Sequence, residues 1–119
     1  MNYKSLNPIL YTKNLDQTIQ FYTEKLGFKC IEKNEALHWA LLQSGTIEIM
    51  FSYPVESIAF ETAQFTGSFY FNIDAVDNLW DELKDNVRIC YEIETFEWGM
   101  REFAIYDNNG YVLQFGEKI

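Results

Sequence analysis

The stretch Trp98-Gly-Met-Arg-Glu-Phe-Ala-Ile-Tyr-Asp-Asn-Asn-Gly-Tyr-Val-Leu-Gln-Phe115 decides the fold of this chain. Polar and apolar residues alternate on both sides of Asp107-Asn-Asn-Gly110, whose residues tolerate positive φ, so the stretch predicts a β-hairpin. Neighbouring side chains on a strand point to opposite faces. We therefore expect Gln114 to point away from its apolar neighbours into a pocket, with the flat surface of Trp98 beside it.

The first half of the chain predicts the order βαβββ. A strand is expected at 6–12, followed by a helix that is capped at Asn14 and that ends at Gly27. Three more strands are expected at 28–32, 37–43 and 46–52. Pro8 has no backbone N–H, so the first strand must lie at an edge of its sheet or pair only through its other side.

The second half repeats this order. A strand is expected at 68–73, then a helix capped by Asp74 or Asp77, then a strand at 87–93 and the hairpin. This repetition predicts a single α+β domain, in which two βαβββ modules form a curved mixed sheet.

The modules are expected at about 5–52 and about 67–117. Residues 53–66 break the pattern, and we interpret them as a linker with a short helical turn within 56–64.

The hairpin sequence resembles that of bleomycin-resistance proteins. These belong to the glyoxalase/bleomycin-resistance/extradiol-dioxygenase superfamily, also called vicinal oxygen chelate. The resemblance rests on Trp98-Gly99, on Arg101-Glu-Phe-Ala104 and on the turn Asp107-x-x-Gly110, with Met100 as one extra residue. It implies the vicinal oxygen chelate fold.

Enzymes of this superfamily hold a divalent metal with four inward side chains, usually His and Glu. The resemblance places these positions at Asn7, Glu48, Ser68 and Gln114. Only Glu48 is anionic, and neutral amide and hydroxyl oxygens are weak ligands for such metals. We therefore expect no metal, no cofactor and no catalytic residue, with Glu48 as a lone base in a metal-free reaction as the alternative. His38, the only histidine, is expected on the third strand, away from these positions.

Charge and composition narrow the choice of partner. Eighteen acidic against nine basic residues give a net charge of −9, which disfavours nucleic acid and membrane surfaces and favours cationic ligands. Eight Tyr, ten Phe and three Trp supply aromatic surface for a ligand, or else fill the sheets. No targeting segment or membrane span is recognisable, so we expect a cytoplasmic protein.

The sequence thus predicts a metal-free protein that binds and sequesters a flat cationic antibiotic. The expected ligand-binding residues are Asn7, Glu48, Ser68, Trp98 and Gln114. The resemblance implies a homodimer with pockets at the subunit interface, and the first strand is free to be exchanged between subunits. Two alternatives stay open: a superfamily enzyme (a lyase, isomerase or dioxygenase) with an atypical metal site, and a binding module for another small metabolite.

Overall fold

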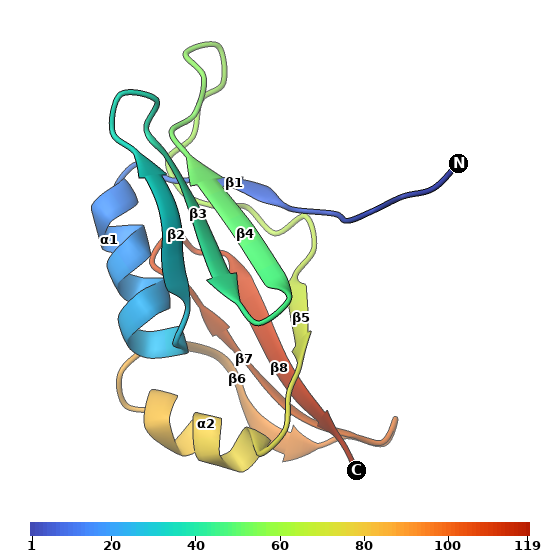
Figure 1. Ribbon diagram of the computed structural model, residues 1–119. Coiled ribbons are helices and arrows are strands. Elements are labelled where there is room, and N and C mark those ends of the chain that lie inside the picture. Colours follow the sequence, from blue (N-terminus) through green and yellow to red (C-terminus); the bar gives the residue numbers. More distant parts are fainter. The chain divides into compact units, whose positions relative to one another are not determined.

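Two four-stranded mixed sheets, one in each half of the chain, carry the fold (Figure 1). The computed structural model describes all residues, 1–119, and the chain divides into two compact units, Met1–Thr62 and Ala63–Ile119. The boundary falls within the segment 53–66. This segment holds no helix, only turns such as the one closed by the Ile58 N–H and the Val55 carbonyl, 3.0 Å apart.

The first unit has the strand order β1-β4-β3-β2. Its strands are β1 (Ile9–Tyr11), β2 (Lys29–Asn34), β3 (Trp39–Ser44) and β4 (Ile47–Ser52). β1 runs parallel to β4 and the other pairs are antiparallel. The first strand lies at an edge, as Pro8 requires, and the Pro8 carbonyl accepts the Met50 N–H at 2.9 Å.

The helix of this unit begins and ends where the sequence predicts. α1 (Leu15–Gln20) continues into a π-helical turn, η1 (Phe21–Lys25). Asn14 caps it, because its Oδ1 accepts the Gln17 N–H at 3.0 Å. Gly27 follows with φ 75°, a conformation that favours glycine.

The second unit has the strand order β5-β8-β7-β6, with β5 parallel to β8. Its strands are β5 (Phe69–Asn72), β6 (Arg88–Thr95), β7 (Met100–Tyr106) and β8 (Val112–Lys118). The predicted hairpin is β7 and β8, joined by a turn in which Gly110 has φ 91°. The predicted fold class and repeated βαβββ order are confirmed.

The cap of the second helix, α2 (Val76–Leu83), differs from the prediction. Neither Asp74 nor Asp77 caps it. The carboxylate of Glu117 on β8 instead accepts the N–H groups of Ala75 and Val76, both at 3.1 Å. Asp77 binds Arg101 of β7, with 2.8 Å between Oδ1 and Nη2. The cap comes from a strand distant in sequence, so a local pattern cannot reveal it.

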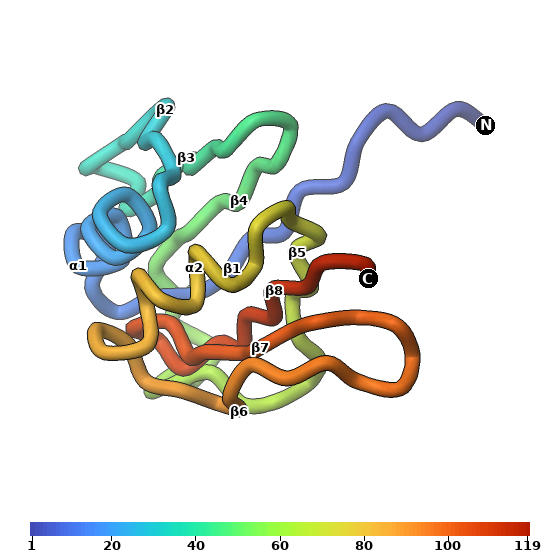
Figure 2. Tube along the Cα trace, turned by 90° about the horizontal axis from the view of Figure 1, so that it is seen from below, coloured from blue at the N-terminus to red at the C-terminus, as the bar shows by residue number.

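One face of the second sheet packs against α2, which contacts β7 and β8 and lies along one side of them (Figure 2). The buried side chains on this face are Phe71 of β5, Phe103 and Ile105 of β7, and Leu113 and Phe115 of β8. The rings of Trp80 on α2 and Phe103 lie 5.1 Å apart. Strand alternation leaves Glu102, Ala104 and Gln114 on the opposite face, called here the network face.

Two register shifts in β6 determine which of its side chains lie on the network face. One lies between Ile89 and Tyr91, and the other between Tyr91 and Glu94. As a result Tyr91 stands opposite Ala104, and Glu94 stands opposite Glu102. Both therefore join the network face.

Neither α1 nor α2 has the length and apolar character that crossing a lipid bilayer requires.

Candidate functional site

A buried carboxylate, Glu102 of β7, is the centre of the site. Glu102 is only 3% exposed, yet several hydrogen-bond donors contact its carboxylate. Oε1 accepts the Trp98 Nε1–H at 3.0 Å and the Tyr70 hydroxyl at 2.9 Å, and Oε2 accepts the Tyr91 hydroxyl. A buried charge is tolerated when donors satisfy it in this way.

Hydrogen bonds extend from this carboxylate across the sheet. The Ser68 hydroxyl donates to Gln114 Oε1, and Gln114 Nε2 donates to the Tyr91 hydroxyl oxygen at 2.8 Å. Tyr91 then donates to Glu102. We call this set, Ser68, Tyr70, Tyr91, Trp98, Glu102 and Gln114, the Glu102 network. Three of its donors, on Tyr70, Tyr91 and Trp98, point toward the Glu102 carboxylate, which fixes their orientation.

The network holds one negative charge at neutral pH. Burial raises the pKa of Glu102, but the hydrogen bonds from Tyr91, Trp98, Tyr70 and Gln114 outweigh burial and hold this pKa below its ordinary value. Burial and the bond to Glu102 raise the pKa of Tyr70 to about 12. Burial is also the largest cause of the raised pKa of Tyr91. The carboxylate stays ionised and both phenols stay neutral, so the network does not form an acid–base pair.

An exposed pair of stacked rings stands beside the carboxylate. Trp98 is 61% exposed, and its ring lies 4.6 Å from that of Phe96 at an interplanar angle of 8°. Tyr91 meets the Phe96 ring edge-on at 5.9 Å. The indole is thus fixed twice, through its face by Phe96 and through its N–H by Glu102.

These groups line a cavity of about 570 Å³, called here the Trp98 cavity. Its lining residues are Tyr91, Glu92, Glu94, Phe96, Trp98, Glu102 and Gln114. The volume falls in the range of small-molecule sites, which combine apolar and aromatic walls with a few polar groups.

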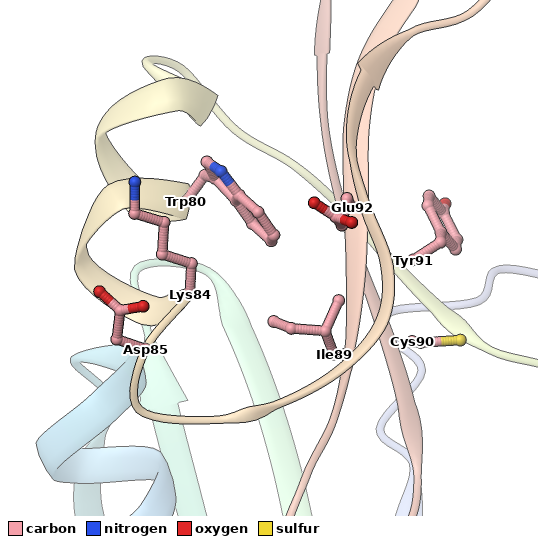
Figure 3. Close-up of a pocket in the computed structure, with 7 residues that line it drawn as sticks. All are labelled: Trp80, Lys84, Asp85, Ile89, Cys90, Tyr91 and Glu92. Carbon is pink, nitrogen blue, oxygen red and sulfur yellow. The ribbon is translucent and has the colours of Figure 1, made fainter.

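A second cavity, of about 530 Å³, lies between α2 and β6 (Figure 3). Trp80, Lys84, Ile89 and Glu92 lie on its side of β6, whereas Tyr91 lies on the other side with Cys90 (Figure 3). Its lysine is already bound to Asp81 at 3.3 Å. This cavity has no stacked pair of rings and no buried charge, so the Trp98 cavity is the stronger candidate.

The four positions aligned with metal ligands form one hydrogen-bonded pair in each unit. In the first unit Asn7 Nδ2 donates to Glu48 Oε1 at 3.0 Å, and Gln43 Nε2 donates to Oε2 at 3.3 Å. In the second unit the pair is Ser68 with Gln114. Each pair joins a residue just before the first strand to a residue on the last strand.

This donor set does not fit a divalent transition metal. Glu48 supplies its only anionic oxygens, and both already accept hydrogen bonds from amides. The other three side chains are neutral and weak ligands. Nowhere in residues 1–119 do three His, Cys, Asp or Glu side chains gather in a group able to hold a metal ion.

His38 lies outside the third strand, contrary to the prediction. It sits in the turn before β3 with φ 49°, and its ring stacks on Tyr53 at 4.5 Å and 4°. The turn extends over 35–38 because Asn34 Oδ1 accepts the Leu37 N–H, so the strand begins only at Trp39.

Of the predicted ligand-binding residues, Trp98 and Gln114 line the Trp98 cavity, and Ser68 joins them through Gln114. Sequence reasoning missed Tyr70, Tyr91 and Glu102. The alternation of β7 holds a signal for Glu102, which has the parity of Ala104 and therefore faces away from Phe103. No comparable signal marks Tyr91, because the register shifts reverse its expected face.

Comparisons with known proteins agree with this architecture. A sequence profile described as Glyoxalase/Bleomycin resistance protein/Dioxygenase superfamily matches residues 5–115. No curated protein matches the chain.

Three solved structures illustrate the shared fold. A protein of unknown function from Agrobacterium tumefaciens has a TM-score of 0.82 at 21% identity, covering 100% of this chain and 97% of its own. A glyoxalase/bleomycin resistance protein/dioxygenase from Nocardioides has 0.82 at 14%, covering 100% and 86%. A lactoylglutathione lyase from the same Agrobacterium species has 0.73 at 18%, covering 98% and 94%. At these identities the likeness concerns the fold alone.

Proposed function

Because the chain belongs to the Glyoxalase/Bleomycin resistance protein/Dioxygenase superfamily, we propose that it is a binding protein without catalytic activity. It sequesters a flat, cationic small molecule, an antibiotic of the bleomycin type, in the Trp98 cavity. The observation that carries the proposal is the exposed stack of Trp98 and Phe96 above the ionised carboxylate of Glu102.

Each part of the cavity matches a property of such a ligand. A flat ring can continue the stack on Trp98, and aromatic pairs contribute roughly 0.5–1.5 kcal/mol beyond the area they bury. A positive charge is attracted by the aromatic faces, by the carboxylates of the cavity and by the net charge of −9. The hydrogen bonds among Ser68, Gln114 and Tyr91 hold the polar wall in one arrangement before a ligand arrives.

The proposal includes a homodimer with the ligand held at the subunit interface. β1 is an edge strand; its first residue, Ile9, is 57% exposed, and Leu6, which precedes the strand, is 88% exposed. Association of two copies would cover such an edge and such apolar surface. Asn7, Glu48 and Ser68 stay predictions as ligand contacts.

The test is the affinity for bleomycin, measured by calorimetry on the unmutated chain and on Trp98→Ala. Losing an aromatic anchor should weaken binding by roughly 1–3 kcal/mol. The variant also loses the indole hydrogen bond to Glu102 and should melt earlier, so the affinity is measured well below its melting temperature. Trp39→Ala, at a tryptophan outside the cavity lining, is the control and should leave the affinity unchanged.

Two results would count against this function. A Trp98→Ala variant that melts earlier but binds normally would make the indole a purely structural group. No binding by the unmutated chain at ~100 μM bleomycin, which means an affinity weaker than about −5.5 kcal/mol, would exclude the antibiotic and leave another small metabolite as the ligand.

The enzyme alternative keeps one observation in its favour, the carboxylate of Glu48 at a position aligned with a metal ligand. We expect Zn²⁺, Ni²⁺ or Mn²⁺ to leave the melting temperature unchanged, because a ligand stabilises only in proportion to its occupancy of the native state. A clear rise at ~10 μM metal, where a tight site is saturated, would favour the enzyme.

A further inference from the structure

We infer that two cross-strand neighbours divide the work of this site: Glu102 is a positioning residue that fixes the Trp98 ring, and Glu94 meets the positive charge of the ligand. The inference rests on the proposed function and assigns separate roles within the same cavity. It differs from the expectation that Glu48 supplies the attraction.

Glu102 has little acceptor capacity left for a ligand. A carboxylate offers about four lone-pair sites. Tyr70, Tyr91 and Trp98 already donate three hydrogen bonds to it. A cationic group that bound Glu102 directly would have to reach a residue that is almost fully buried. Donors of the protein itself therefore stabilise the charge of Glu102.

Through one of these bonds Glu102 sets the orientation of an exposed ring. Trp98 protrudes into solvent, where an indole ordinarily samples several rotamers. The bond from its Nε1–H to Glu102 and the stack on Phe96 restrict it to one plane before binding. Ordering one such side chain during binding lowers affinity about 2- to 10-fold, so the carboxylate gains affinity without touching the ligand.

Glu94 is the carboxylate that remains available. It stands directly opposite Glu102 in the β6–β7 ladder, lines the cavity and is exposed, and its side chain makes no hydrogen bond or ion pair. Like charges placed opposite each other on a sheet repel. A cation stacked on Trp98 beside Glu94 would remove this repulsion. Glu92, two residues earlier, points to the α2 side of the strand (Figure 3).

The positioning role is tested first without any ligand, by NMR of the indole N–H groups. The chain has three tryptophans, and Trp98→Phe identifies the resonance of Trp98. In Glu102→Gln we expect this resonance to shift and its exchange with solvent to accelerate, while those of Trp39 and Trp80 stay in place. An unchanged Trp98 resonance in a folded Glu102→Gln protein would overturn the positioning role.

A double-mutant cycle then separates positioning from direct contact. The probes are bleomycin and N-methylquinolinium, a simple flat aromatic cation. If Glu102 acts through the indole N–H, Glu102→Gln weakens binding in the unmutated background and has little effect in Trp98→Phe. Equal losses in both backgrounds would mean that Glu102 meets the ligand itself, against the inference.

Glu94→Gln and Glu97→Gln form a matched pair with the same change of charge, at an exposed residue of the cavity lining and at an exposed residue outside it. We expect Glu94→Gln to weaken binding of either probe about 2- to 5-fold, less so at high salt, and Glu97→Gln to leave it unchanged. Equal losses of affinity in the two variants would mean that Glu94 acts only through the net negative charge of the protein and does not contact the ligand. If neither probe binds, the proposed function fails, while the NMR measurement still decides the role of Glu102.

Discussion

The ring of Tyr70 lies over Gly116, in space that any side chain at that position would fill. A Cβ on Gly116 would be 2.0 Å from the hydroxyl oxygen of Tyr70 and 2.6 Å from its Cζ. Gly116 is the ladder neighbour of Glu102, so the missing side chain lets a phenol on edge strand β5 cross β8 and reach a carboxylate on β7. This glycine is needed for close approach rather than for an unusual φ.

Gly116→Ala should therefore detach Tyr70 from Glu102. Tyr70 is partly exposed and can turn outward, so the expected loss is one hydrogen bond to a charged group, about 1.5–3 kcal/mol of unfolding free energy in urea. Tyr70→Phe removes the same bond without crowding and is the matched control. The double variant should cost no more than either single change. Additive losses would show that Gly116 has another role.

The phenols of Tyr70 and Tyr91 should lose their protons only at a pH above the ordinary range for tyrosine. The pKa of Tyr70 is raised from 10.0 to about 12, and that of Tyr91 is raised as well. Because the fold favours their protonated forms, this stabilisation is complete below the ordinary pKa of 10.0 and is lost as the pH rises toward about 12. Phenolate absorbance should show a late phase that disappears in Tyr70→Phe/Tyr91→Phe. A late phase retained in that variant would contradict the assignment.

Glu117→Ala should destabilise the second unit by about 1 kcal/mol, within a range of about 0.5–2, because two N–H groups at the start of α2 lose their acceptor. The measurement is the denaturant midpoint of unfolding. Asp74→Ala is the control, since Asp74 precedes the same helix but makes neither of these bonds. The opposite ranking of the two variants would restore the local cap that the sequence suggests.

Sedimentation at micromolar concentration should give a homodimer. Ile9→Lys on β1 should convert it to a monomer, because a charge there opposes burial of the exposed edge. Ile31→Lys on β2, at the other edge of the same sheet and 51% exposed, should leave the dimer intact. A monomeric unmutated chain would refute the dimer, and dissociation by both variants would remove β1 from the interface.

Much of the fold follows from local patterns. Asn14 and Gly27 mark the limits of the first helix, Pro8 places β1 at an edge, and the turn at Asp107–Gly110 fixes the hairpin. These features depend on residues close together in sequence, and their physical causes act over the same short range.

The site was predictable only in part, because its contacts join residues far apart in the chain. Alternation along β8 placed Gln114 on the correct face, and the flat surface of Trp98 was expected beside it. Glu102 lies in the quoted stretch, but its role depends on Tyr70 and Tyr91, which come from other strands. Whether these two residues lie beside Glu102 depends on the register of their strands, which the sequence of one strand does not reveal.

The two register shifts in β6 each reverse the alternation of side chains, and the second reversal cancels the first. The first shift turns Tyr91 onto the network face, and the second restores the ordinary alternation by Glu94. Only the residues between the two shifts lie on the face opposite to the one that an unbroken alternation would give them. Each shift takes up one extra residue of β6, so the length of the segment can change without moving its functional side chains. Deleting one extra residue should remove one shift and keep the later partners on β7, and deleting both should leave a regular ladder in which Tyr91 and Glu94 still stand opposite Ala104 and Glu102.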